Sequence, residues 1–400
     1  MGNNNSEQLE THFDDEFFCS QFDGLSLKPS AFYNACKEGN IAVLRQHLRP
    51  LLHKNRLHRI EPNGDIALHA AARAGHALVV ELLLTNGFSC TMVNQEGKTA
   101  YESALNDEIR HLFHRSISER YSRFNDKNVD KTLNILNKNI HNERVVKQSK
   151  DAIQSRYMNR FHRMPKCFRN IIKKLTEARS IEAFEHIIGN LGFSPDNMTG
   201  NHMLIQTIFD DYLQTKNANS LIHLYTLNDL YREIREHSDA YTTLIYLHLA
   251  SLSQRAYQGT CYRGIRMSKF DVTRYYYAMR YNCIIETYNF ASTSKVKNVS
   301  LLYSGHSETC DQHLYSVLFI FEFSNSCKTA IDLTRVSENL PPLSQYPDEE
   351  EVLILPYTLF KVLTVIEATD NEPFTIFLQN IPVPDQSLLS FMYMNQKRLV

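Results

Sequence analysis

The sequence is poor in several features that would define a function by themselves. Its 400 residues include no tryptophan, and 43 Lys and Arg nearly balance 44 Asp and Glu. This balance gives no overall electrostatic preference for nucleic acid. No run of about 18 apolar residues occurs, so a membrane-spanning helix is not expected. Because the polar, acidic start does not match a signal peptide, we expect a soluble protein in the cytoplasm.

Cysteine pairs and glycine-rich loops are also missing. The eight cysteines are isolated, and no CxxC pair indicates a zinc site or a disulfide framework, so we expect mostly reduced, buried thiols. The histidines show no metal-binding spacing, and we assign no chemistry to His306 or His313. None of the 13 glycines forms a GxG pair, which excludes Rossmann and P-loop phosphate loops. A nucleotide site must therefore use side chains.

Positive charge is concentrated in one segment. Residues 115–179 contain 17 Lys and Arg against 6 Asp and Glu, with apolar residues at helical spacing. We interpret the basic residues as the solvated faces of helices. Alternatively, they support weak membrane association together with a lipid, because Met1–Ser6 matches the pattern for myristoylation of Gly2. The other interpretation is that the N-terminal segment is simply polar and that Gly2 carries no lipid.

A repeat of 33 residues organises the first quarter of the chain. Gly64, in an Asn-Gly-Asp turn, and Gly97, in a Glu-Gly-Lys turn, each precede an alanine-containing helix start, the second at Tyr101–Ala104. Together with the apolar segment Val79–Leu84, this pattern resembles ankyrin repeats. We expect two and a half copies that end near Phe113 and are capped by the following helices. Such repeats imply a protein partner.

The hydrophobic period changes in the second half of the chain. From about residue 115 to 215 the spacing predicts helices separated by turn residues. After Cys261 short β-rich runs follow, and we expect strands at 316–323, 329–333, 352–355, 361–367 and 374–378. Helices followed by strands indicate an α+β domain.

Two short motifs in this α+β region carry candidate chemistry. Tyr262-Arg263-Gly264 offers a guanidinium for phosphate or ribose oxygens, beside a glycine that lets the backbone approach a ligand. Phe290-Ala291-Ser292-Thr293-Ser294 supplies three hydroxyls that can bond a sugar or a carboxylate. Each motif taken alone is also typical of an ordinary strand or turn.

A third motif is acidic. Asp348-Glu349-Glu350-Glu351 runs directly into the apolar Val352–Leu355. Four acids in a row usually form a solvated loop. If Glu349 to Leu355 is one extended segment, however, Glu349 and Glu351 share a face that Glu350 does not. Two neighbouring carboxylates can stabilise a cationic transition state and accept a proton.

In this order the three motifs resemble the Arg–Ser–Glu signature of the arginine-specific mono-ADP-ribosyltransferases. Ser292 follows Arg263 by 29 positions and Glu351 follows Ser292 by 59, and the upstream Leu224-Tyr225-Thr226 also suits that family. The resemblance covers roughly residues 180–378. It implies two packed β-sheets with an N-terminal helical lobe, NAD as co-substrate without a metal, and a target protein that bears arginine.

The resemblance implies that one group of residues binds NAD. Arg263 would bind its phosphate and ribose, with the backbone of Gly264 near the nicotinamide. Ser292 would hold the catalytic carboxylate, and the adjacent Thr293 and Ser294 would also contact the co-substrate. Glu351 would bond the nicotinamide ribose and stabilise the oxocarbenium-like species formed as nicotinamide leaves.

The resemblance implies that a second group receives the acceptor. Glu349 would orient the incoming guanidinium and take its proton. Tyr346 would meet the protein substrate, or else it is a loop tyrosine that covers the core. Phe290 and Tyr303 would stack on nicotinamide, or else they belong to the core.

We therefore interpret the chain as a multidomain protein. We expect a flexible tail at 1–28, ankyrin repeats at 29–116, a basic helical linker at 117–179, a catalytic domain at 180–385 and a C-terminal tail at 386–400. The expected activity is transfer of ADP-ribose from NAD to arginine. The alternatives are an NAD glycohydrolase and an ankyrin adaptor with an inactive catalytic domain.

Overall fold

The computed structural model describes residues 29–53, 59–115, 133–135, 166–189, 191, 200–227, 230, 234, 238–303, 314–369 and 372–382. Gly2, both predicted tails, His306 and His313 lie outside these residues. The chain divides into two compact units. The first comprises Met1–Leu83 and Met92–Leu112. The second comprises Leu84–Thr91 and Phe113–Val400.

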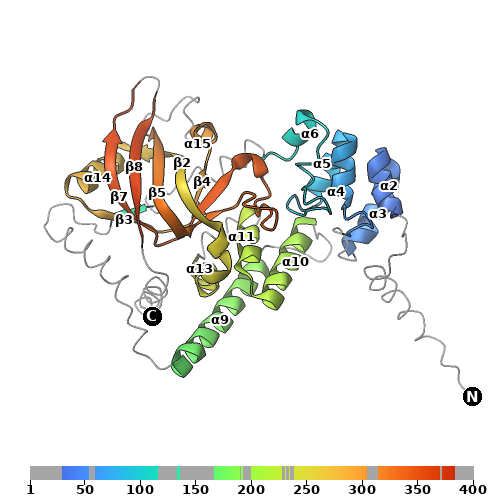
Figure 1. The fold of residues 1–400 in the computed structure, drawn as a ribbon, viewed down its shortest axis with the longest axis horizontal. Coiled ribbons are helices and arrows are strands. Elements are labelled where there is room, and N and C mark those ends of the chain that lie inside the picture. The colour runs from blue at the N-terminus through green and yellow to red at the C-terminus, as the bar shows by residue number, and fades with distance from the viewer. Residues whose placement is uncertain are drawn as a thin grey trace, which may run out of the picture. The chain divides into compact units, whose positions relative to one another are not determined.

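The first unit consists of short helices joined by tight turns (Figure 1). Its helices are α2 (Ala31–Glu38), α3 (Ile41–His53), α4 (Ala67–Ala74), α5 (Ala77–Thr85, whose last residues belong to the second unit) and α6 (Asp107–His111). Gly39 and Gly75 end α2 and α4 with φ of 74° and 78°. Because an L side chain is strained there, glycine stops each helix and allows the next to begin within three residues.

Backbone hydrogen bonds repeat with the predicted period of 33. The Glu61 N–H donates to the Asp65 carbonyl at 2.8 Å, and the Asn94 N–H donates to the Lys98 carbonyl at 2.9 Å. The third copy differs from the prediction, since Tyr101–Ala104 does not start a helix. Thr99 and Glu102 cap each other's backbone N–H over a single turn, and the next helix, α6, begins only at Asp107.

Asp65 connects successive copies of the repeat. Its carboxylate accepts hydrogen bonds from Arg73 at 2.8 and 2.9 Å, from Tyr33 at 2.8 Å and from Asn94 at 3.0 Å. Burial opposes ionisation of this group, but the bonds from Arg73, Asn94 and Tyr33 outweigh it and hold the pKa of Asp65 below its usual value. The charged carboxylate therefore stabilises the stacked turns.

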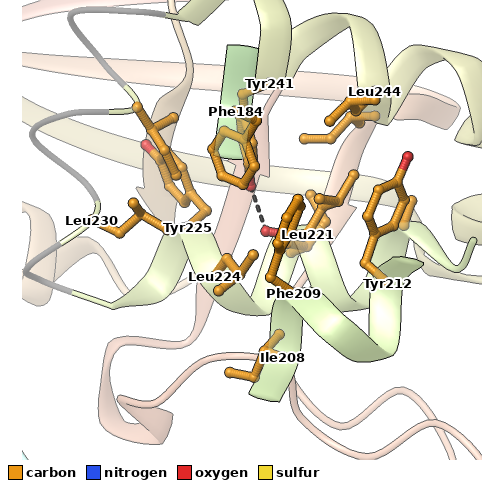
Figure 2. Packing of buried hydrophobic residues seen from close by; sticks show 14 of the residues in the cluster. Phe184, Ile208, Phe209, Tyr212, Leu221, Leu224, Tyr225, Leu230, Tyr241 and Leu244 are labelled. Carbon is orange, nitrogen blue, oxygen red and sulfur yellow. Dashed lines mark hydrogen bonds between the residues drawn. The ribbon is translucent and has the colours of Figure 1, made fainter. Parts of the chain in front are cut away.

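The second unit opens with a helical lobe, as the hydrophobic spacing predicted. It contains α9 (Lys166–Gly189), α10 (Gly200–Thr215), α11 (Ala218–Thr226), α13 (Ser238–Leu247) and the 3₁₀ helix η4 (Leu249–Arg255). Figure 2 shows the aromatic side chains of Phe184, Phe209 and Tyr241 packed between these helices, where the Tyr241 hydroxyl donates to the Leu221 carbonyl. Helix α9 runs across residue 180, at which we expected the catalytic domain to begin.

One part of the predicted helical segment is a strand instead. Leu133–Ile135 forms β1, which pairs antiparallel with β3 (Ile284–Thr287). The helical prediction for these three residues is therefore wrong, because pairing with a sheet edge overrides a helical spacing. The rest of the linker up to residue 165 lies outside the described residues.

The strands form one hydrogen-bonded sheet. The further strands are β2 (Ala256–Ser268), β4 (Ala291–Ser294), β5 (Leu314–Asp332), β6 (Glu351–Ile354), β7 (Leu359–Ile366) and β8 (Phe374–Ile381), and the order is β1-β3-β7-β8-β5-β2-β4-β6 with an added β5–β6 pairing. The two sheets implied by the resemblance are joined, because β5 pairs with β2, β6 and β8, and β2 also pairs with β4. Strand β5 is continuous where two shorter strands were expected.

The sheet separates two apolar cores. One core joins the helical lobe to side chains such as Leu353 and Leu355. The other includes Val352 and Ile354 together with α14 (Lys269–Arg280), which packs on that side of the strands (Figure 1). Alternation along β6 thus sends successive side chains into different cores. Hydrophobic burial on both faces fixes the register of the strands that carry the motifs.

Candidate functional site

Neighbouring strands bring the three sequence motifs together. Strand β4 pairs antiparallel with β6, so that Ser294 lies opposite Glu351 and Ser292 lies opposite Leu353. Strand β2 pairs with β4 where Tyr262 lies opposite Ser294. Directly paired residues of antiparallel strands present their side chains on the same face. Ser292, Ser294 and Glu351 therefore share one face, which is the face of the helical lobe.

The two glutamates belong to different elements, which the sequence did not predict. Strand β6 begins at Glu351, while Glu349 ends the 3₁₀ helix η5 (Pro347–Glu349), and Glu350 has a left-handed φ of 41°. The prediction of one extended segment from Glu349 is therefore wrong, since Pro347 favours a tight turn at this point. Glu349 and Glu351 are each 1% exposed, whereas Glu350 is exposed.

Arg263 is buried at the junction of β2 and β4. Its side chain alternates with Tyr262 along β2, and its Nη1 donates to the Ser292 carbonyl at 2.6 Å. The following residue, Gly264, lies opposite Leu318 of β5. The Arg263 side chain leaves β2 on the face opposite to Ser292 and Glu351, because Tyr262 is the residue paired with Ser294. Its guanidinium reaches the backbone of the strand that carries the serine motif. Its predicted role toward the phosphate and ribose of NAD stays a prediction.

The three hydroxyls of the second motif have different surroundings. The Ser292 hydroxyl oxygen lies 3.2 Å from the Tyr225 phenol oxygen, while Ser294 accepts from the backbone N–H of Val296 at 3.0 Å. Thr293 faces the opposite side of β4 and donates to the Val352 carbonyl at 2.6 Å. The Thr293 hydroxyl therefore supports the pairing of β4 with β6, and alternation separates it from Ser292 and Ser294.

The predicted aromatic residues divide between core and loop. Phe290 is buried, with ring centroids 5.3 Å from both Tyr225 and Tyr241, which is the core alternative for this residue. Tyr303 ends helix α15 (Lys297–Tyr303), and its side chain lies outside the described residues. Tyr346 lies in the loop just before η5.

Arg115 binds the predicted acceptor residues, a contact that no pattern in the sequence predicts. Its Nε donates to Glu349 Oε1 at 2.9 Å and its Nη2 to Glu349 Oε2 at 3.4 Å. The guanidinium carbon lies 3.6 Å from the centroid of the Tyr346 ring. The side chains of Arg115 and Glu349 are 0% and 1% exposed. The separation of 234 residues explains why no local pattern could reveal this pair.

A second arginine fixes the loop that leads to the acidic motif. Arg255, at the end of η4, is buried and donates to the carbonyls of Asp332, Thr334 and Pro341. Burial disfavours the charged guanidinium and lowers the pKa of Arg255 to about 10. Its hydrogen bonds hold the backbone between β5 and η5, and so help to position Glu349.

Comparison with known proteins gives a sequence match for the first unit. Residues 31–117 match ankyrin repeats, in three copies. This stretch is an ankyrin-repeat region. The match confirms the prediction from the 33-residue period, and the described helices α2 to α6 fall within it. No curated protein sequence matches the chain.

Three solved structures that are similar to the chain are of bacterial proteins. They include the Vis toxin, an ADP-ribosyltransferase from Vibrio splendidus, with 16% identity over 62% of this chain and 89% of that chain and a TM-score of 0.25. The ADP-ribosyltransferase HopU1 of Pseudomonas syringae is 16% identical over 67% and 99%, with a TM-score of 0.27. The type III effector XopAI from Xanthomonas axonopodis is 17% identical over 61% and 95%, with a TM-score of 0.35.

Three further features of the described residues concern cysteine reactivity, metal-binding groups and membrane-spanning helices. Cys36, Cys90, Cys261 and Cys283 are buried free thiols, as expected, and Cys327 is also buried, with its sulfur 3.3 Å from the Thr329 hydroxyl. Burial raises the pKa of Cys90 and of Cys261 to about 12, so these two thiols are protonated at pH 7. In the part of the chain that the structure describes, no group of three or more metal-binding side chains occurs, and no helix is long and apolar enough to cross a membrane.

Proposed function

We propose that the second unit transfers ADP-ribose from NAD to an arginine side chain of another protein. The observation that carries this proposal is the guanidinium of Arg115 on Glu349 and Tyr346. These are the two residues that the motif resemblance assigns to the acceptor. This site has a carboxylate that accepts hydrogen bonds from two N–H groups, and an aromatic ring against the guanidinium. Such a site suits the planar, forked guanidinium of arginine and not a lysine ammonium.

The proposed reaction divides the work between the two buried glutamates. The bond between the nicotinamide nitrogen and ribose C1″ breaks, and nicotinamide leaves with the electron pair. Glu351 stabilises the positive charge that then develops on the ribose, an effect that is stronger in a buried site than in water. A terminal nitrogen of the acceptor arginine forms the new bond to C1″, and the proton that it loses passes to Glu349.

Other residues support this chemistry from neighbouring strands. In the proposal, Arg263 neutralises diphosphate charge, and Ser292, bonded to Tyr225, keeps the face of Glu351 polar. The ankyrin repeats contribute a surface for a protein partner. A cytoplasmic location and acylation of Gly2 remain predictions from the sequence alone.

A direct assay tests the proposed function. The full chain is incubated with NAD labelled in its adenine, with and without agmatine, a small guanidine acceptor. We expect labelled ADP-ribosyl-agmatine and an equal amount of nicotinamide. Free ADP-ribose as the sole product indicates an NAD glycohydrolase, and no turnover of NAD indicates an adaptor. Either of these two results contradicts the proposal.

A further inference from the structure

We propose that Arg115 is an internal occupant of the acceptor site, which must leave before an arginine of another protein can be modified. This inference rests on the proposed function. The guanidinium of Arg115 faces both oxygens of Glu349, at 2.9 and 3.4 Å, and covers the ring of Tyr346. A second guanidinium cannot make the same paired contact while Arg115 is present.

Burial makes the occupied site inaccessible. Arg115 has 0% of its side chain exposed and Glu349 has 1%. Glu351, Ser292 and Arg263 are buried as well. An acceptor side chain therefore cannot reach Glu349 by diffusion alone, because the Glu349 side chain is almost completely buried. The described conformation is closed to an external acceptor.

A second contact holds the same loop at a neighbouring position. The side-chain oxygen of Gln345 accepts from the backbone N–H of Cys90 at 2.8 Å, and both residues are buried. Two upstream segments of the second unit, 84–91 and 113–115, thus bind the loop on either side of Tyr346. One buried hydrogen-bonded contact to each segment restrains the loop more than a single contact would.

Occupation from within the chain has a specific kinetic signature. An internal ligand reduces the apparent affinity for an external one by the fraction of molecules in which the site is empty. Arg115 covers the acceptor carboxylate, so its removal affects the acceptor and not the binding of NAD. A residue that merely stabilised the fold would change both substrates or neither.

The test uses two substitutions in the full chain. We expect Arg115→Gln to lower the KM for agmatine about tenfold or more, as for a site that is open in roughly one molecule in ten. Arg115→Lys gives a smaller fall, because lysine keeps the charge but lacks the fork. The KM for NAD and hydrolysis of NAD without acceptor stay within about twofold of the wild type in both variants. Arg110→Gln, on helix α6, is the matched control and retains the wild-type KM.

A measurement on the wild-type chain keeps the test independent of variant folding. Hydrogen exchange in peptides that cover 113–115 and 344–349 is compared with and without saturating agmatine. We expect agmatine to increase exchange at 113–115, since displaced Arg115 loses its buried partner.

The outcomes separate this inference from the proposed function. Transfer to agmatine with an unchanged KM in both Arg115 variants, or unchanged exchange at 113–115, overturns the inference and leaves the proposed function intact. Absence of transfer in every chain contradicts the proposed function itself. ADP-ribose found by mass spectrometry on Arg115 of the wild type shows that NAD reaches this residue in its buried position, and overturns the blocking role.

Discussion

The phenol oxygen of Tyr225 lies 3.2 Å from the hydroxyl oxygen of Ser292, and both side chains are buried. Tyr225 belongs to α11 of the helical lobe, and Ser292 belongs to β4. The ring of Tyr225 also packs 5.3 Å from that of Phe290, two residues before Ser292. The hydrogen bond and the ring contact together restrain the Ser292 side chain, so Tyr225 is a positioning residue for the second motif.

Tyr225→Phe removes the hydroxyl that contacts Ser292 and keeps the aromatic ring. We expect the kcat of transfer to fall about three- to tenfold, the effect of one buried neutral hydrogen bond, with little change in the KM for NAD. Tyr212→Phe is the matched control. The Tyr212 hydroxyl, in the same core, has no hydrogen-bond partner among the described residues. Equal activity of both variants in steady-state assays would show that the Tyr225 hydroxyl does not position Ser292.

Glu351→Gln tests the charge that stabilises the ribose cation. We expect transfer and NAD cleavage both to fall by about 10² or more, the effect of losing a transition-state stabiliser, while NAD still binds in a calorimetric titration. Glu350→Gln, a change of the exposed neighbour, retains activity. Wild-type turnover in the Glu351 variant would refute the assignment.

Glu349→Gln separates the acceptor step from nicotinamide release. We expect transfer to agmatine to fall by about 10², because general-base catalysis is lost, while hydrolysis of NAD continues. Product analysis by chromatography of labelled NAD distinguishes the two activities. Normal modification of agmatine by this variant would show that Glu349 does not receive the acceptor.

Arg255→Met tests the support of the loop before η5. Three backbone carbonyls lose their donor, at a cost of roughly 2–5 kcal/mol in the free energy of unfolding. Chemical denaturation followed by fluorescence measures this loss. Arg280→Met, at an exposed position near the end of α14, is the control and stays close to wild type. A loss below about 1 kcal/mol would mean that the loop does not depend on Arg255.

His69 makes the first unit sensitive to acid. Its Nδ1 accepts the Ile66 N–H at 3.3 Å, and its Nε2 lies 3.0 Å from the Lys98 carbonyl, which requires the neutral ring. Burial lowers the pKa of His69 below its usual value. The unfolded chain therefore binds more protons than the folded chain between the two pKa values, and stability falls as the pH drops through about 6.5.

His69→Gln removes this titration while offering a similar acceptor and donor. We expect the wild-type Tm of the first unit to fall more than that of the variant between pH 7.5 and 5.5, in calorimetry of the full chain. His47→Gln, at an exposed position on α3, is expected to keep the wild-type pH dependence. Parallel pH profiles for His69→Gln and the wild type would contradict the role of His69.

Local patterns in the sequence predicted the main helical and strand regions and their order. The 33-residue spacing of Gly64 and Gly97 indicated the ankyrin repeats, because a turn that needs glycine recurs once in each copy. Runs of β-branched and aromatic residues indicated β5 to β8. Phe290 had the core as one of its stated alternatives.

Long-range contacts could not be predicted in this way. The turn at Pro347–Glu349, the strand formed by Leu133–Ile135 and the partner of the Ser292 hydroxyl each depend on which segments meet in the folded chain. The same holds for Arg115, which seemed to be one of many basic residues in a helical segment.

The sequence by itself determined the repeat, the α+β class and the residue types of the candidate site, since these follow from spacing and side-chain chemistry between near neighbours. Only the tertiary structure decided that Glu349 ends a 3₁₀ turn and is buried there, and that Arg115 covers it. The physical reason is that buried charges need partners, and the fold supplies this partner from a segment 234 residues away.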